Sequence, residues 1–296
     1  MSTQLAKFLE TCWAFRNNVN LQDSEGKLDL YLLYCGRVHE QQDRPDEWTH
    51  GATQSIPRFF EGLASIGSGY EIMIQPYGIL GEVLEDTEFD RDGDGRLMIA
   101  RILNRARRSP DLWGPVLWDL AMSFVHFIRN GAPAMRRVYL NVRPACRVQV
   151  CKFLATELLD ISEAGRFKVL GPLQKGYDTI VIYVANDDGV LKVLKSVAEY
   201  QTSFAAYFDF PVINIAKPAK HHGKALRGVA VATEPGDFQT IAPIHKRNPS
   251  FGDFWERLLL PFLADSKTET MFFQNALATM KKLGINPMYP YKFLRK

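Results

Sequence analysis

The sequence predicts an α+β protein with a helical N-terminal part and a mixed or antiparallel sheet in the C-terminal half, flanked by helices. In the first part, apolar residues recur at helical spacing, whereas the second part holds short runs of β-branched and aromatic residues. These runs follow the order strand–helix–strand–strand–helix–strand, which favours α+β over a regular βαβ wind. We expect two regions, residues 1–130 and residues 131–296, in two domains or one continuous domain.

The N-terminal region begins with an amphipathic helix that packs on the body of the protein, because Leu5, Phe8, Leu9, Cys12 and Trp13 follow i, i+3, i+4 spacing. The rest of residues 1–75 is predicted to be mainly helical, with turns near 17–26 and 41–51. Beyond it we expect short strands at 71–84, a charged loop at 86–95, and one helix over 111–130 that ends at Asn130-Gly131.

The C-terminal region supplies most of the predicted sheet. Strands are expected at 137–142, 166–170, 179–185 and 211–216, with helices at 145–159, 189–206, 252–264 and 266–284. After Lys217, a long loop is expected to lead to the run that starts at Gly228.

Composition narrows the possible functions. A hydrophobic fraction of 46% and an aromatic fraction of 12% suffice for a globular core. The net charge of +3 is small and spread along the chain, so nucleic acid is not an expected partner. No apolar run approaches the length of a membrane span, and the N-terminus lacks the pattern of a secretion signal. The four cysteines form no CxxC pair, which indicates reduced thiols and a cytoplasmic location.

The sequence offers no convincing metal or nucleotide motif. Asp90, Asp92 and Asp94 match positions 1, 3 and 5 of a calcium loop, but Arg101 stands where the loop needs its bidentate carboxylate. No complete dinucleotide loop, P-loop, nucleophile elbow or HExxH occurs. The adjacent pair His221-His222 is poorly arranged for chelation, since neighbours in a strand point apart. We therefore expect neither a metal nor another cofactor.

Two groups of polar residues remain as candidates. The predicted loop at 217–227 concentrates cations and two histidines, which indicates either a solvated basic loop or a flap that holds phosphate. In the strand at 137–142, alternation places Arg137, Tyr139 and Asn141 on one face. Such a polar face is costly in a buried strand unless it lines a cleft or is paired. Lys168 and Asp178 follow nearby, and Asp178 could instead form a structural ion pair with Lys168 or Arg137.

The chain resembles the HopA-type effector family over roughly residues 130–291. The resemblance is carried by a spaced series of short motifs: Arg137–Val142, Phe167–Leu170, Tyr177–Tyr183, Gly228–Pro235, Ser250–Gly252 and Gly284–Tyr291. Members of that family are bacterial type III effectors. Related proteins occur in gene clusters for thioamitides and class V lanthipeptides, where they are regarded as lyases. They work with a separate phosphotransferase-like kinase that phosphorylates a precursor peptide.

The resemblance implies a cofactor-free phosphoserine/phosphothreonine lyase that leaves dehydroamino acids in its peptide. Elimination needs a base for the α-proton, donors for the enolate-like carbonyl, cations for phosphate and an acid for the leaving oxygen. The implied base is Lys168, oriented by Asp178, with His221, His222 or Tyr139 as the acid and Asn141 as a donor to the enolate. The implied ligands of phosphate and peptide are Arg137, Lys175, Tyr177, Lys217, Lys220, Lys224 and Arg227.

One departure from the family pattern leaves an alternative open. Where family members often carry arginine just before the aspartate, this chain has Gly176-Tyr177, and Lys175 is the only nearby cation that could replace it. A non-catalytic protein that binds the peptide or the kinase is therefore the second hypothesis. It predicts a groove or sheet edge for an extended peptide, with the cations scattered rather than convergent.

Overall fold

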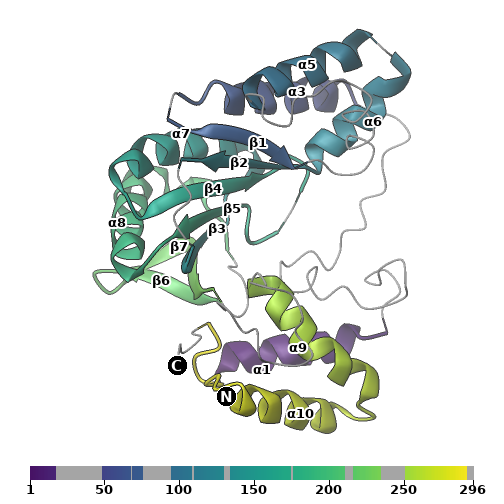
Figure 1. Cartoon of the computed structure of the whole chain (residues 1–296), viewed down its shortest axis with the longest axis vertical. Coiled ribbons are helices and arrows are strands. Elements are labelled where there is room, and N and C mark those ends of the chain that lie inside the picture. Colours follow the sequence, from purple (N-terminus) through teal and green to yellow (C-terminus); the bar gives the residue numbers. More distant parts are fainter. Residues whose placement is uncertain are drawn as a thin grey trace.

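One antiparallel sheet organises the protein, with helices on both of its faces (Figure 1). The computed structural model describes residues 1–17, 49–67, 69–75, 95–108, 110–129, 134–174, 176–210, 216–234 and 251–291. The seven strands stand in the order β1-β2-β4-β5-β3-β7-β6, and all neighbouring strands are antiparallel. The strands are β1 Glu71–Gln75, β2 Phe124–Ile128, β3 Arg136–Leu140, β4 Ala164–Leu170, β5 Ile180–Val184, β6 Lys217–His221 and β7 Lys224–Thr233.

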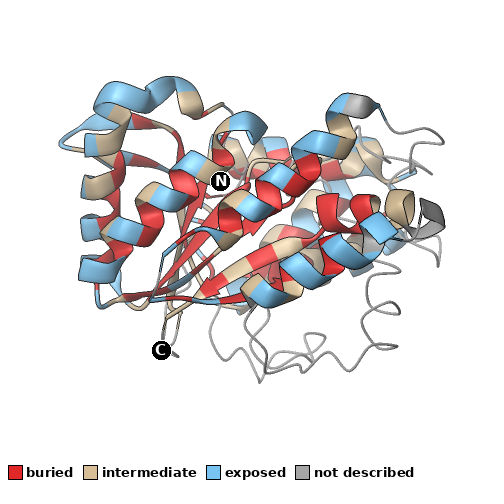
Figure 2. Ribbon diagram, turned by 90° about the horizontal axis from the view of Figure 1, so that it is seen from above, coloured by how far each residue is buried: buried red, intermediate tan, exposed pale blue. Residues whose placement is uncertain are grey.

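The back face of the sheet, which carries Val138, Phe167 and Ile182, packs against the larger group of helices. Successive side chains of a strand point to opposite faces of the sheet, so every second residue enters this core. Figure 2 shows the buried residues on the strands and on the sides of the helices that meet them. The helices are α3 His50–Ala64, α5 Gly95–Arg108, α6 Pro110–Ala121, α7 Arg147–Glu157 and α8 Asp187–Phe204, and single 3-10 turns lie at Pro144–Cys146, Leu158–Asp160 and Ala205–Tyr207.

The front face, which carries Tyr139, Val181 and Lys168, is covered only in part. Helices α1 (Thr3–Phe15), α9 (Phe251–Asp265) and α10 (Glu269–Lys282) form a second core with β5, β3 and β7. Over β1, β2 and β4 most front-face side chains are exposed or half-buried: Glu71, Met73 and Gln75 on β1, Phe124, His126 and Ile128 on β2, and Arg166 and Lys168 on β4. The front face of β1, β2 and β4 is therefore an open region beside the helical layer. Side chains in this open region can contact a substrate from solvent.

Several sequence predictions are confirmed. Helix α1 buries Leu5, Phe8, Leu9 and Cys12 of the predicted apolar face, and the fifth residue, Trp13, is half-buried against the same core. The Ser2 side chain caps the helix by accepting a hydrogen bond from the backbone N–H of Leu5. The alternation in β3 is also as predicted, with Tyr139 in the front core and Val138 in the back core. The strands near 166–170 and 179–185 and the helices near 145–159, 189–206, 252–264 and 266–284 are present.

The predicted single helix over 111–130 is wrong. Helix α6 ends at Ala121, and strand β2 follows at Phe124–Ile128. Backbone hydrogen bonds from Met122 to Trp118 and from Ser123 to Leu120 close the helix. The next five residues then pair with β1 on one side and with β4 on the other, and tertiary pairing overrides their helical spacing. The sheet therefore also takes strands from the N-terminal half.

The predicted loop after Lys217 is a β-hairpin instead. Strands β6 and β7 pair directly, and His222 and Gly223 form the turn with φ values of 47° and 78°. A two-residue turn with positive φ at both positions matches the right-handed twist of the strands that it joins. The predicted strand at 211–216 and the acidic loop at 86–95 fall almost entirely outside the described residues, at 211–215 and 86–94. None of the described helices is long and apolar enough to cross a membrane.

Candidate functional site

The open region of the front face brings together a histidine and a lysine from adjacent strands. His126 of β2 and Lys168 of β4 are register partners, and on the other side of β4 Lys168 stands opposite Val181 of β5. Both side chains point to the front, since Phe127 and Phe167 belong to the back core. Directly opposite residues in an antiparallel pair have Cβ atoms about 5 Å apart, so the two side chains lie within reach of one substrate group.

His126 is held in its neutral form. Its Nε2 lies 3.2 Å from Oε1 of Gln75 on β1, which positions the ring. Burial, and to a smaller extent the neighbouring cations Lys168 and Arg166, lowers the pKa of His126 to about 4. An imidazole with this pKa carries no charge at neutral pH until an anion binds beside it.

Arg166 and Lys168 are cations with aromatic rather than acidic neighbours. The Lys168 Nζ lies 4.6 Å from the centre of the Phe124 ring, and the Arg166 Cζ lies 4.2 Å from the centre of the Tyr183 ring. Within the described ranges neither side chain has a carboxylate within ion-pair distance. Two cations on adjacent front-face positions of one strand, with no carboxylate partner among the described residues, form a site suited to an anion such as phosphate.

Arg137 completes this cationic row, but it is already paired. Its guanidinium lies 4.9 Å from the centre of the Tyr183 ring, on the same ring that Arg166 contacts. It forms an ion pair with Glu234, and the two side chains are only 14% and 10% exposed. Glu234 therefore offsets much of the positive charge that Arg137 would offer to a phosphate, and sequence reasoning did not predict this partner.

The remaining predicted residues of the sheet lie deeper. Tyr139 is buried in the front core under the helical layer, and Tyr177 packs against the same core. Asn141 and Asp178 are also buried, and the backbone of Asn141 is fixed by bonds to Gly228 and Asp209. The open surface, by contrast, belongs to β2 and β4. Lys175 lies outside the described residues.

Arg147 fixes the turn that leads to Asp178. This fully buried arginine of α7 donates from Nη2 to the Gln174 carbonyl at 2.6 Å, and from Nη1 to the Gly171 carbonyl. It also lies within hydrogen-bond distance of the carbonyls of Val142 and Leu170. One guanidinium thus satisfies carbonyl groups from the end of β3 and from the segment between β4 and β5.

The predicted hairpin cations are not brought to this site. Lys217, Lys220 and Lys224 are exposed on β6 and β7, at the sheet edge opposite to β1. Three strands separate β6 from β4, and four strand spacings amount to about 19 Å. The rings of His221 and His222 lie 4.1 Å apart beside the hairpin turn, at the same edge. The structure therefore separates these residues from Lys168.

Arg227 lies near neither Lys168 nor the hairpin turn and instead binds the segment that follows α8. Its Nε donates to the Phe208 carbonyl at 2.6 Å, and its Nη2 lies 3.7 Å from the Asp209 carboxylate, which also pairs with Arg143 at 2.9 Å. Arg227 therefore fastens β7 to the segment after α8.

Sequence reasoning missed His126 and Arg166. The signal for His126 was present, because Phe-Val-His-Phe-Ile has the composition of a strand and follows Ser123. Because these residues were assigned to a helix, the prediction did not include the strand alternation, which points His126 to one face of the sheet and Val125 and Phe127 to the other. Arg166 was visible two residues before Lys168, on the same face of a predicted strand.

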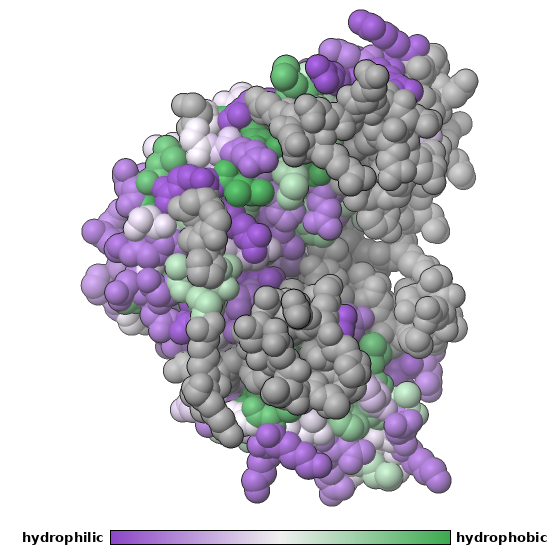
Figure 3. All heavy atoms as spheres, in the orientation of Figure 1, coloured by the Kyte–Doolittle hydropathy of each residue, from purple (hydrophilic) through white to green (hydrophobic). Residues whose placement is uncertain are grey.

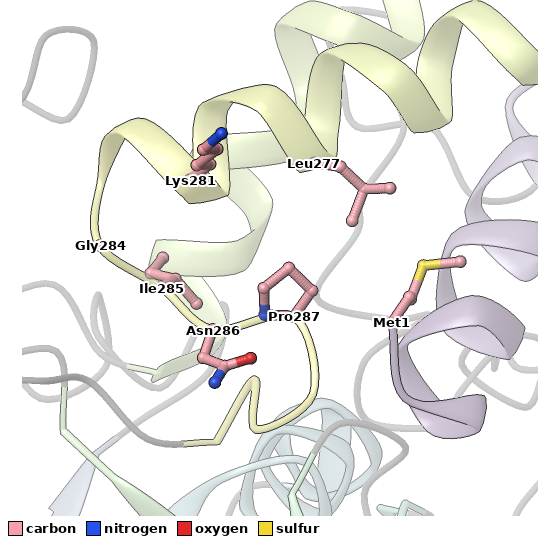
Figure 4. Close-up of a pocket in the computed structure, with 7 residues that line it drawn as sticks. All are labelled: Met1, Leu277, Lys281, Gly284, Ile285, Asn286 and Pro287. Atoms are coloured by element: carbon pink, nitrogen blue, oxygen red, sulfur yellow. The ribbon is translucent and has the colours of Figure 1, made fainter.

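A pocket of about 380 Å³ lies elsewhere, where α10 ends. Figure 4 shows Met1, Leu277 and Pro287 around it, with Lys281 on the last turn of the helix. Its lining is mostly apolar, and Lys281 is the single charged side chain among the lining residues. It lacks the acid, base and anion ligands that the open front face provides. Across the described ranges, no three His, Cys, Asp or Glu side chains are grouped to hold a metal ion.

The histidine–lysine pair carries a prediction about stability at low pH. The pKa of His126 is about 4 in the folded protein, whereas the ordinary value of 6.5 applies to the unfolded chain. As the pH falls, His126 therefore binds a proton in the unfolded chain before it does so in the folded protein. Wild-type protein should lose up to ~3 kcal/mol of unfolding free energy through this group as the pH falls from 6.5 towards 4. In urea titrations at pH 7 and pH 4.5, His126→Gln should lose less stability than wild type. Equal losses in both proteins would contradict the placement of His126.

Bacterial effector proteins share this fold. The effector protein from Pseudomonas syringae pv. tomato strain DC3000 has a TM-score of 0.57 and 16% identity, over 99% of this chain and 96% of that chain. The effector protein from Pseudomonas syringae pv. syringae strain 61 has a TM-score of 0.55 and 13% identity, over 100% of this chain and 99% of that chain.

The type III effector/phosphothreonine lyase OspF from Shigella flexneri has a TM-score of 0.28 and 12% identity, over 36% of this chain and 63% of that chain. That score is too low to establish a common fold. No protein-family model and no curated protein sequence matches the chain. The chain therefore has the fold of the Pseudomonas syringae effector proteins, in agreement with its sequence resemblance to effectors.

Proposed function

We propose that the protein is a lyase that eliminates phosphate from phosphoserine or phosphothreonine in a peptide. The observation that carries this proposal is the cross-strand pair of His126 and Lys168, flanked by Arg166 on an open surface. A base, an acid and an anion ligand are the groups that β-elimination needs. Their register on two paired strands fixes their spacing without any flexible loop.

The chemical step assigns one role to each group. Arg166 binds the phosphate oxygens. The Lys168 Nζ in its neutral form takes the proton from Cα, the electron pair forms the Cα=Cβ bond, and the Cβ–O bond breaks. Phosphate leaves with the electron pair of the broken Cβ–O bond, and His126 in its protonated form gives a proton to the leaving oxygen. The products are a dehydroamino acid and hydrogen phosphate, with no net oxidation.

Phosphate binding prepares the pair for this step. Burial, together with the positive charges of Lys168 and Arg166, keeps His126 neutral in the free protein. A phosphate dianion between these groups counters both cations, so it raises the pKa of His126 and favours the imidazolium. The substrate thus favours the protonated His126 that the reaction uses to protonate the leaving oxygen.

The hairpin cations are expected to contribute little to this step. The double variant Lys220→Ala/Lys224→Ala should change kcat/KM for a short phosphothreonine peptide by less than about twofold, because exposed charges beyond one Debye length are largely screened. Arg166→Met should lower the same parameter by at least about tenfold, as expected for a charge-assisted phosphate contact. Steady-state phosphate release measures both. A larger effect from the hairpin variant would show that the edge at β6 belongs to the site.

A separate kinase would supply the phosphorylated substrate, as the resemblance implies. The fold shared with effector proteins supports a role in acting on proteins or peptides, and the substrate could be a precursor peptide or a protein of another cell. In either case the donor reaction is phosphorylation of a Ser or Thr hydroxyl.

The second candidate is a non-catalytic phosphopeptide-binding protein. It is favoured by the ion pair of Arg137 with Glu234, which leaves fewer free cations for phosphate than a strong lyase site would hold. Mass spectrometry of a phosphothreonine peptide incubated with the protein separates the two. Loss of H₃PO₄, with a product that adds a thiol, supports the lyase. Binding of the peptide with no change in mass supports the second candidate, and loss of HPO₃ would instead show hydrolysis.

A further inference from the structure

The front face leaves one direction open to a peptide whose phosphoresidue lies at Lys168. Towards β5 and β3, the next front-face residues in the same row are Val181 and Tyr139, which are buried under the helical layer. Towards β2 and β1, the row continues through His126 to Met73, which is 44% exposed. A substrate peptide therefore leaves the site across β2 and β1, because the opposite direction is filled by packed side chains.

Three apolar side chains lie along this direction. Met73 is the register partner of His126 on β1, and Phe124 and Ile128 flank His126 on the front face of β2. The Phe124 ring also contacts the Lys168 ammonium group. Over the view in Figure 3, hydrophobic atoms form small groups among hydrophilic ones. An apolar strip beside a phosphate-binding group is therefore a local feature rather than the general character of the surface.

Met73 is unusual for its position. Among the described strands β1 stands at the edge of the sheet, and natural edge strands commonly carry charged residues on their exposed side to prevent pairing with other chains. Here the exposed side reads Glu71, Met73, Gln75, so the apolar residue occupies the centre, level with the His126–Lys168 pair. Methionine is flexible and polarizable, and it suits surfaces that accept several apolar partners.

From these observations we infer that Met73, Phe124 and Ile128 form a subsite for an apolar side chain of the substrate peptide. The inference rests on the proposed function and deepens it by naming the substrate class: phosphopeptides with leucine, methionine or a similar residue near the phosphoresidue. Two strand spacings separate Lys168 from Met73, about 10 Å, which is about three residues of an extended chain. The subsite therefore reads positions two or three residues from the phosphoresidue.

Two phosphothreonine peptides test the subsite. One carries leucine and the other serine at the positions two and three residues before and after the phosphothreonine. Wild-type protein should bind the leucine peptide about tenfold more tightly, which is the gain from burying part of one aliphatic side chain. Fluorescence anisotropy measures binding, and phosphate release measures turnover of the same peptides.

Two matched variants identify the residue. Met73→Gln should reduce the tenfold preference to less than twofold, whereas Met271→Gln, at a residue of α10 that is 42% exposed, should leave the preference intact. Equal binding of both peptides by wild type, or a preference that survives Met73→Gln, would overturn the subsite. Because binding and turnover are measured separately, a preference in binding without elimination would contradict the lyase and still support the subsite.

Discussion

Lys168→Met is expected to lower the rate of phosphate elimination by a factor of about 10²–10⁴, the usual contribution of a positioned general base. The variant keeps a side chain of similar length and apolar stem, so the contact with Phe124 is largely preserved. Single-turnover measurements with saturating enzyme report the chemical step directly. Lys152→Met, at an exposed residue of α7, is the matched control and should retain full activity.

The same variant has a readout that does not depend on activity. Lys168 is one of the cations that lower the pKa of His126, so Lys168→Met should raise that pKa. NMR titration of the His126 ring measures the change. An unchanged pKa together with unchanged activity would show that the two side chains do not share a site.

Arg147→Met is expected to give the largest loss of stability. The guanidinium of Arg147 is buried and donates to the carbonyls of Gly171 and Gln174, in the segment between β4 and β5. Its removal takes the guanidinium donor away from the buried carbonyls of Gln174 and Val142, at a cost of about 1–3 kcal/mol for each group, so we expect a loss of about 3 kcal/mol or more. A loss of this size corresponds to a fall in Tm of roughly 6–12 °C.

Thermal unfolding monitored by circular dichroism checks this expectation. Arg101→Met, on the exposed side of α5, is the matched control and should change the free energy of unfolding by less than about 0.5 kcal/mol. A fall in Tm for Arg147→Met that is no larger than for the control would show that Arg147 does not hold the turn before Asp178.

The elements with strong local patterns could be predicted from the sequence. Helix α1 has apolar residues at helical spacing and a serine cap, and β3 alternates strictly between its two faces. In both cases the local pattern and the tertiary environment agree. The predicted strand at 166–170 also includes Lys168, but the sequence pattern does not indicate which strands lie beside it.

The site depended on information that no local pattern holds. His126 reaches Lys168 only because β2 inserts between β1 and β4, and that register is set by packing of Val125 and Phe127 in the back core. The stretch that contains them has enough apolar residues for either a helix or a strand, so spacing alone was ambiguous. The cationic segment at 217–227 suggested a flap because its charges are close in sequence, whereas sheet order carries it to the far edge.

The central claim is that Lys168 removes the α-proton while His126 protonates the leaving phosphate. The most direct test uses a peptide with deuterium at Cα of its phosphothreonine, followed by mass spectrometry and phosphate release in a single turnover. We predict a product that has lost the phosphate group and the deuterium of Cα. This product should form more slowly than the product of the protiated peptide, and it should be absent with Lys168→Met. Phosphate release with the deuterium retained would contradict elimination and identify the protein as a phosphatase.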